Sequence, residues 1–147
     1  MKTVRHIYIH QCKNNHMARR ITPYLSVGCK DDRQKIKNKF DVIVSMVKSE
    51  QEQTYEFCIP DGPHEYIIFK DAVDFVIEKL DEKKSVLVQC QAGISRSVSV
   101  CIASHACHNR VSFEVAYILC SHDIYHPSKE LIKSAKKYIN ENQKTIK

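Results

Sequence analysis

Residues 85–107 constrain the fold more strongly than any other part of the chain. A compact apolar run at residues 85–89 has the length and composition of a strand. After a short loop, residues 98–107 are apolar around nearly the whole circumference of a helix, so this helix must be covered on all sides. A strand that leads through a loop into a buried helix is an arrangement suited to a binding site.

The rest of the chain alternates between strand-like and helix-like patterns. β-branched or alternating runs predict short strands at residues 24–27, 41–47 and 54–59. Apolar residues at three- and four-residue steps predict helices at residues 66–80, 113–120 and 128–138. Residues 31–40 are polar and predict an exposed helix or a loop. Strands that alternate with helices predict an α/β fold with a central, mainly parallel sheet flanked by helices.

Turns are expected wherever one pattern gives way to the next. The chain has only three glycines, and each falls between segments of different periodicity: Gly28, Gly62 and Gly93. Because glycine accepts backbone angles that other residues resist, we expect each of the three at a turn.

The composition indicates one globular domain inside a cell. With 147 residues, of which 43% are hydrophobic, the chain fills a single core. It has no apolar run long enough to span a membrane, and its basic start lacks the hydrophobic centre of a secretory signal. Its seven cysteines form no CxxC pair, which argues against a secreted disulfide framework. We therefore expect an intracellular protein in the cytoplasm, with the nucleus left open.

A net charge of +6 favours anionic partners such as phosphorylated molecules, acidic proteins or nucleic acid. Nucleic acid is disfavoured, because the C-terminal lysines are not interleaved with aromatic residues and are better explained as a solvated helix face. Two sets of side chains have spacings that a metal would accept: Cys101 with His105, and Cys120 with His122 and His126. Burial for packing is the favoured interpretation of these cysteines, and we expect no metal and no cofactor.

The loop between the central strand and helix contains a cysteine and an arginine separated by five residues, Cys90 and Arg96. The spacing alone is a weak signal, but here the loop contains Gly93 and enters a helix whose first turn has unpaired N–H groups. Successive backbone amides can point at a tetrahedral oxyanion, and the planar guanidinium of Arg96 can bind two of its oxygens. The predicted phosphate-binding residues are Gln91, Ala92, Gly93, Ile94, Ser95 and Arg96.

A bound phosphate above Cys90 predicts a nucleophile aimed at phosphorus, because the positive surroundings favour the thiolate. Cys90 would form a phosphocysteine while a positioned acid protonates the leaving oxygen, and water would then release the phosphate. The amides and Arg96 already balance the phosphoryl charge, so this chemistry requires no metal. Ser97 either donates a hydrogen bond to the sulfur or serves as an N-cap or first-turn hydroxyl.

The segment VLVQCQAGISRS, with the preceding helix DAVDFVIEKL, resembles the signature region of the cysteine-dependent dual-specificity protein phosphatases, in particular the small atypical members. The resemblance extends from ITPYLSVGCKDD to IYHPSKELIKSAKKYI and covers roughly residues 21–140. It implies the protein tyrosine phosphatase-like fold, a shallow pocket that reaches phosphotyrosine and phosphoserine or phosphothreonine, and no cofactor. It also divides the chain into an N-terminal extension or arm at residues 1–20 and a catalytic domain at residues 21–147.

The resemblance also implies a general acid, which the family carries on a loop roughly thirty residues before the cysteine. Asp61 matches this place, because it lies 29 positions before Cys90 in a Pro-Asp-Gly-Pro turn. The structural alternative is a turn aspartate bonded to its own backbone, and Glu65 is the substitute acid. The chain departs from the family at Gln89, where a histidine is usual; glutamine carries no charge, so we expect a less ionised thiol or slower turnover.

The sequence therefore predicts a phosphoprotein phosphatase with dual or tyrosine-leaning specificity and phosphorylated proteins as substrates. The same loop would also suit an RNA 5′-phosphatase or a phosphoinositide phosphatase. Gln89 raises a third possibility, a phosphate-binding pseudophosphatase, although pure binding requires neither the thiol of Cys90 nor the acid of Asp61. The basic N-terminal arm is interpreted either as a substrate-docking or homodimer-forming segment, or as an extra edge strand at residues 4–9 or a loosely held end.

Overall fold

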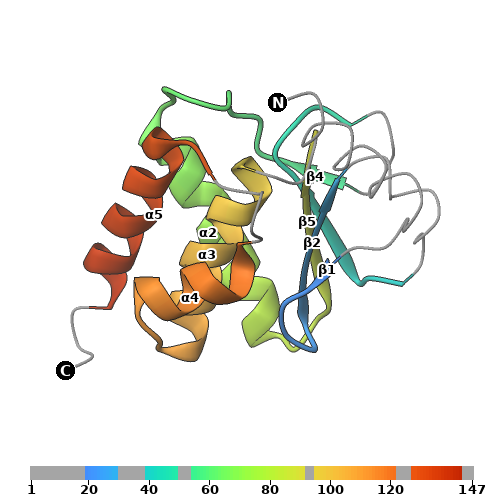
Figure 1. Ribbon diagram of the computed structural model, residues 1–147. Coiled ribbons are helices and arrows are strands. Elements are labelled where there is room, and N and C mark those ends of the chain that lie inside the picture. Colours follow the sequence, from blue (N-terminus) through green and yellow to red (C-terminus); the bar gives the residue numbers. More distant parts are fainter. Residues whose placement is uncertain (1–18, 30–38, 50–53, 92–94, 122–126, 144–147) are drawn as a thin grey trace, which may run out of the picture.

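The computed structural model describes residues 19–29, 39–49, 54–91, 95–121 and 127–143. In this part of the chain five strands form one sheet, and four helices pack together on one of its faces (Figure 1). The strands are β1 (Arg19–Arg20), β2 (Leu25–Cys29), β3 (Val42–Ser45), β4 (Thr54–Glu56) and β5 (Val86–Cys90). The helices are α2 (Tyr66–Asp81), α3 (Arg96–Asn109), α4 (Phe113–Cys120) and α5 (Lys129–Asn142).

The order of the strands across the sheet is β1-β2-β5-β3-β4. β2, β5, β3 and β4 run parallel, and only β1 pairs antiparallel with its neighbour β2. The prediction of a mainly parallel sheet is therefore confirmed. β5 lies at the centre of the sheet, and all five of its residues are buried.

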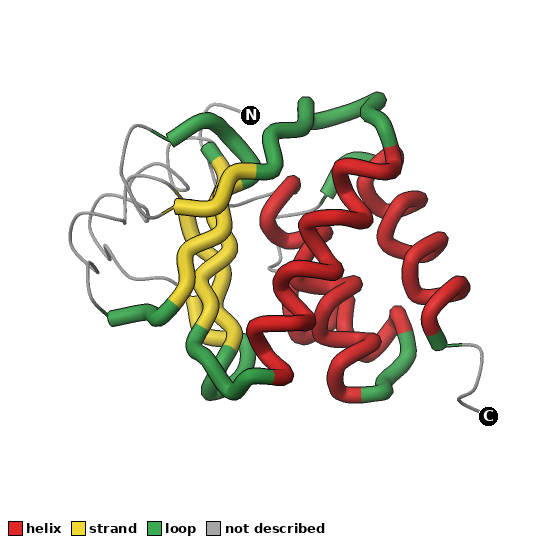
Figure 2. The backbone as a smooth tube through the Cα atoms, turned by 180° about the vertical axis from the view of Figure 1, so that it is seen from behind, coloured by secondary structure: helices red, strands yellow, loops and turns green. Residues whose placement is uncertain are grey.

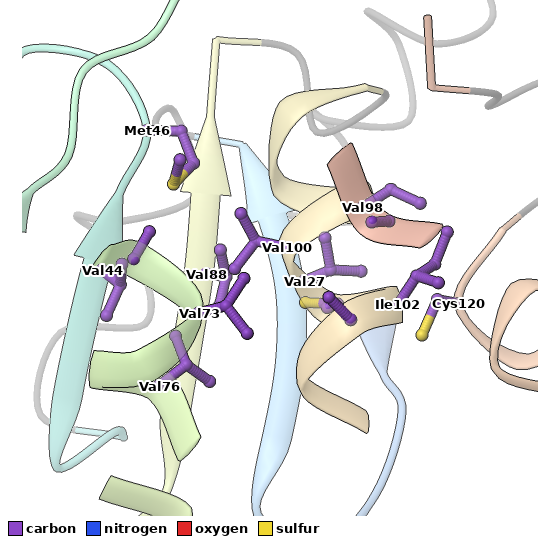
Figure 3. Close-up of a cluster of buried hydrophobic side chains, with 14 of the residues drawn as sticks. Val27, Val44, Met46, Val73, Val76, Val88, Val98, Val100, Ile102 and Cys120 are labelled. Atoms are coloured by element: carbon purple, nitrogen blue, oxygen red, sulfur yellow. The ribbon is translucent and has the colours of Figure 1, made fainter. Parts of the chain in front are cut away.

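The core lies between the sheet and the helices, which Figure 2 shows from the opposite side. Alternate strand residues point to the helical face, so Val44 of β3 and Val88 of β5 face Val73 and Val76 of α2 (Figure 3). α3 is buried from Ser97 to Ala106, which confirms the predicted central helix. Burial of each valine stabilises the fold by roughly 1.5–3 kcal/mol, so this interface holds the sheet against the helices.

Serine side chains define where two of the helices begin. Ser112 Oγ accepts a hydrogen bond from the Val115 N–H ahead of α4, and Ser128 Oγ accepts one from the Leu131 N–H ahead of α5. α4 has the predicted bounds. α5 begins after Ser128 as predicted but continues to Asn142, because Tyr138 and Ile139 still bury their side chains in its last turns.

Two local predictions are wrong. Gly28 does not lie at a turn: it lies inside β2 as the Cα partner of Gln89, because the parallel pairing of β2 and β5 continues one residue further. The strand predicted at residues 54–59 is regular only over Thr54–Glu56. Beyond it Phe57 and Ile59 still donate backbone hydrogen bonds to the carbonyls of Ser45 and Met46, so the segment stays against the sheet edge without forming a regular ladder.

Gly62, in contrast, has a positive φ of 150° in the loop before α2, as a turn glycine was expected to have. Gly93, the predicted strand at residues 4–9 and most of residues 31–40 lie outside the described residues. Of the predicted N-terminal arm the structure describes Arg19 and Arg20, which form β1. Within the described ranges, no helix has the length and apolar character that crossing a membrane requires.

Candidate active site

Cys90 is the last residue of β5, where the central strand ends and the chain turns toward α3. Its side chain is 2% exposed and points, with Val86 and Val88, to the face covered by the helices. The Cys90 Sγ atom lies 3.1 Å from Ser97 Oγ. Ser97 is buried in the first turn of α3, and Ser95 rather than Ser97 occupies the N-cap position. The end of the strand and the start of the helix thus bring the thiol and the hydroxyl together.

Arg96 is the first residue of α3 and is half-buried. Its Nη1 donates a hydrogen bond to the Ile59 carbonyl at 3.2 Å. Ile59 lies two residues before Asp61, so the guanidinium lies against the loop that carries the predicted acid. A guanidinium has five N–H donors, and this contact leaves others that can bind an anion.

The Asp61 side chain makes a direct hydrogen bond to a residue of the Cys90–Arg96 segment. Its Oδ1 accepts a hydrogen bond from Ser95 Oγ at 2.6 Å, although 34 residues separate the two positions. Ser95 Oγ in turn accepts the backbone N–H of Ser128 at 2.8 Å. Glu65, the substitute acid, is exposed and occupies the N-cap position of α2. The structure therefore joins Asp61, rather than Glu65, to the candidate phosphate loop.

His64 holds the Asp61 loop against α5. Its Nδ1 lies 2.6 Å from the Gly62 carbonyl and its Nε2 lies 2.7 Å from Ser134 Oγ. Because a carbonyl oxygen only accepts, Nδ1 carries a proton in this arrangement. Sequence reasoning missed this anchor, since the only local signal was the position of His64 directly after the Pro-Asp-Gly-Pro turn.

The backbone part of the predicted phosphate site is described only in part. Gln91 is exposed at the start of the loop and Ser95 is buried at its end. The three residues between them lie outside the described residues: Ala92, Gly93 and Ile94. Sequence reasoning gave Ser95 a backbone role only, and its side-chain contacts to Asp61 and Ser128 are an addition from the structure.

Gln89, which departs from the family pattern, is fully buried on the sheet face opposite Cys90. Its Cα partners are Gly28 of β2 and Ser45 of β3. Within the part of the chain that the structure describes, neither Oε1 nor Nε2 has a hydrogen-bond partner. Each unpaired buried polar group costs about 1–3 kcal/mol, so Gln89 destabilises the strand that carries the thiol.

Four cysteines outside the loop have raised pKa values, the opposite of what a reactive thiolate requires. Burial raises the pKa of Cys107 to about 11 and that of Cys120 to about 12, and it raises the pKa of Cys101 well above its ordinary value. Burial and, secondarily, the charge of Glu56 also raise the pKa of Cys58. These four thiols stay protonated at neutral pH.

The two candidate metal sets are not assembled among the described residues, where no three potential ligands cluster. Cys101 and His105 are buried within α3, and His105 Nδ1 lies 2.6 Å from Asn109 Nδ2. His122 and His126 lie outside the described residues.

Comparison with known proteins identifies the family of the domain. Residues 29–147 match the family model of the dual specificity phosphatase catalytic domain. Dual specificity protein phosphatase 1 of Mus musculus is 43% identical over 49 residues, which is 33% of this chain and only 13% of that protein. The chain thus matches about an eighth of the length of this relative.

Solved structures share the fold. The Cydia pomonella PTP-2 phosphatase aligns with a TM-score of 0.70 and 22% identity, over 83% of this chain and 89% of its own. Human DUSP28 aligns with a TM-score of 0.72 and 17% identity, over 84% of this chain and 93% of its own. The expected phosphatase-like fold is therefore confirmed. Because the family model covers most of its length, the chain belongs to the dual specificity phosphatase catalytic domain family.

Proposed function

We propose that this chain is a phosphoprotein phosphatase that hydrolyses phosphotyrosine, and phosphoserine or phosphothreonine in addition, through a phosphocysteine intermediate. One observation carries the proposal: a buried thiol and a carboxyl group both contact the short segment that begins α3. Cys90 Sγ is 3.1 Å from Ser97 Oγ, and Asp61 Oδ1 is 2.6 Å from Ser95 Oγ. A nucleophile and a proton donor beside a helix N-terminus are the groups that phosphoryl transfer requires. The catalytic domain in this proposal spans residues 21–147.

In the first step the Cys90 thiolate attacks phosphorus. The S–P bond forms while the bond from phosphorus to the leaving oxygen breaks, and Asp61 transfers its proton to that oxygen. The N–H groups of the loop and the first turn of α3, together with Arg96, stabilise the charge on the phosphoryl oxygens. No other group is needed to balance the step.

In the second step water attacks the phosphorus of the phosphocysteine. Asp61, now a carboxylate, accepts a proton from the water, and the P–S bond breaks to restore the thiolate. The Ser97 hydroxyl donates a hydrogen bond to the departing sulfur, which its 3.1 Å distance from Cys90 Sγ allows.

Hydrolysis of aryl phosphates with good and poor leaving groups tests the proposal. We expect Cys90→Ser to abolish turnover for all of them. Asp61→Asn should lower kcat by about 10²- to 10⁴-fold for poor leaving groups and much less for good ones, because only a poor leaving group needs the proton. Glu65→Gln is the matched control from the same loop and should resemble wild type. Equal rates for wild type and Cys90→Ser would contradict the proposal, and a loss specific to Glu65→Gln would reassign the acid.

The substrate class is tested by comparing kcat/KM for a phosphotyrosine peptide, a phosphothreonine peptide, an RNA with a 5′-triphosphate and an inositol phospholipid. We expect the highest value for the phosphotyrosine peptide. A higher value for the RNA or the lipid would assign one of those substrates instead. Binding of phosphopeptide with no hydrolysis of any of the four would identify a pseudophosphatase.

A further inference from the structure

The side chain of Ser95 connects three parts of the molecule that are distant in sequence. Ser95 immediately precedes α3 and is 6% exposed. Its hydroxyl donates to Asp61 Oδ1 in the loop before α2 and accepts the backbone N–H of Ser128 at the start of α5. The two distances are 2.6 Å and 2.8 Å, which are ordinary hydrogen-bond lengths for an O–H and an N–H donor.

The hydroxyl is not used for helix capping, although Ser95 occupies the N-cap position. A serine at this position usually accepts an N–H of the first turn, and such a bond is worth about 1 kcal/mol. Ser95 makes no side-chain cap hydrogen bond, and its backbone has φ −116° and ψ −62° rather than the extended conformation usual for a cap. The side chain is therefore directed toward Asp61 at the expense of the helix that it precedes.

The bond from Ser128 determines where the hydroxyl proton points. A backbone N–H only donates, so it occupies a lone pair of Ser95 Oγ. The single hydroxyl proton is then directed to Asp61 Oδ1. A backbone amide does not change its role with pH, so Ser128 continues to occupy this lone pair throughout the proposed reaction. While Ser95 donates to Oδ1, Oδ2 is the carboxyl oxygen left to carry the acid proton in the proposed reaction.

We propose that Ser95 is a positioning residue for the general acid, which holds the Asp61 carboxyl so that Oδ2 carries the proton and delivers it to the leaving oxygen. The inference rests on the proposed function and adds to it a residue that acts through Asp61 rather than on the phosphate. Ser128 is itself held by α5, because its Oγ accepts the Leu131 N–H. The acid is thus oriented by the starts of α3 and α5 as well as by its own loop.

The test is a double-mutant cycle between Ser95→Ala and Asp61→Asn with a poor leaving group. We expect Ser95→Ala alone to lower kcat by about 10- to 100-fold, as for a displaced reacting group, with KM changed less than threefold. The loss should shrink for a good leaving group. In the Asp61→Asn background Ser95→Ala should have no further effect on kcat, because the group that it positions is already lost. Ser95→Thr retains the hydroxyl and should recover most of the activity.

Ser104→Ala is the matched control, since Ser104 is a buried serine of α3 whose hydroxyl has no hydrogen-bond partner among the described residues. It should leave kcat unchanged for both leaving groups. Urea unfolding of each variant establishes that the compared proteins are folded. If Ser95→Ala lowers kcat equally for good and poor leaving groups, and its effect multiplies with that of Asp61→Asn, Ser95 does not act through Asp61 and the inference is overturned. Failure of the proposed function has a different signature, which is activity that survives Cys90→Ser.

Discussion

At the scale of single residues, the contact between Cys90 and Ser97 matters most for the second step of the proposed reaction, in which the thiolate leaves phosphorus. The Cys90 sulfur at the end of β5 is nearly inaccessible, and the Ser97 hydroxyl lies 3.1 Å away in the buried first turn of α3. A hydrogen bond to a developing thiolate is worth about 1.5–3 kcal/mol. Its loss should therefore slow the step in which the thiolate is released more than the step in which it attacks.

Ser97→Ala is expected to lower the steady-state kcat by about 10- to 100-fold through slower hydrolysis of the phosphocysteine. Rapid-quench measurements with an aryl phosphate should then show a burst of the released phenol that approaches one equivalent per enzyme. Ser104→Ala serves again as the control and should resemble wild type. A fall in kcat without a burst would place the role of Ser97 in the first step instead.

At the scale of elements, the loop between β4 and α2 is held by two helices that come later in the chain. α3 contributes the Arg96 contact to the Ile59 carbonyl, and α5 contributes Ser134, which lies 2.7 Å from His64 Nε2. The loop contains Gly62 with a positive φ and makes few regular backbone bonds, so these side-chain contacts are its main restraints. The orientation of Asp61 therefore depends on helix placement.

Ser134→Ala should loosen this loop without unfolding the domain. We expect faster amide hydrogen exchange at residues 57–65 and unchanged exchange in the middle of α2, together with a roughly 2- to 10-fold lower kcat for poor leaving groups. Mass spectrometry of exchanged peptides measures the first effect. Ser112→Ala removes the cap of α4 and costs about 1 kcal/mol of stability, yet it should leave exchange in the loop unchanged. Equal exchange in wild type and Ser134→Ala would show that His64 does not anchor the loop.

The elements were largely predictable, because their patterns are local. The apolar stripe of α2 and the all-round apolar surface of α3 appear within one stretch of sequence each. The position of Cys90 at a strand end and Ser97 in the next helix follows from the same stretch. Gly28 was misplaced, because its location inside β2 depends on pairing with Gln89, 61 residues later. The contacts of Ser95 with Ser128 and of His64 with Ser134 were missed because they span 33 and 70 residues, and no local pattern reports them.

At the scale of the whole molecule, α3 is the buried central helix of the fold. One of its buried side chains can titrate. His105 is 5% exposed, and burial, with a smaller contribution from His108, lowers its pKa below the ordinary value of 6.5. Between the lowered pKa and 6.5 the unfolded chain binds a proton that the folded chain does not. The free energy of unfolding should therefore decrease as the pH falls through this window.

His105→Gln is expected to weaken this acid sensitivity, because glutamine does not titrate and its amide oxygen can still accept from Asn109. Urea unfolding at pH 7.5 and pH 5.5 measures the difference in stability between the two pH values for each protein. Wild type should lose more stability on acidification than the variant. An identical loss in both would assign the acid sensitivity to other groups.

The hydrogen bond between Ser95 and Ser128 means that the acid and the thiol are held by different parts of the fold. The Cys90 sulfur is positioned by β5 and by Ser97 of α3. The Asp61 carboxyl is instead linked through Ser95 to Ser128, the residue before α5. A small outward shift of that helix end would remove the Ser128 N–H from Ser95 and so weaken the orientation of the carboxyl, while the thiol would stay in place. In the proposed reaction such a domain would still form the phosphocysteine from easily cleaved esters but would hydrolyse it slowly, so this contact would set how fast the bound phosphoryl group is released.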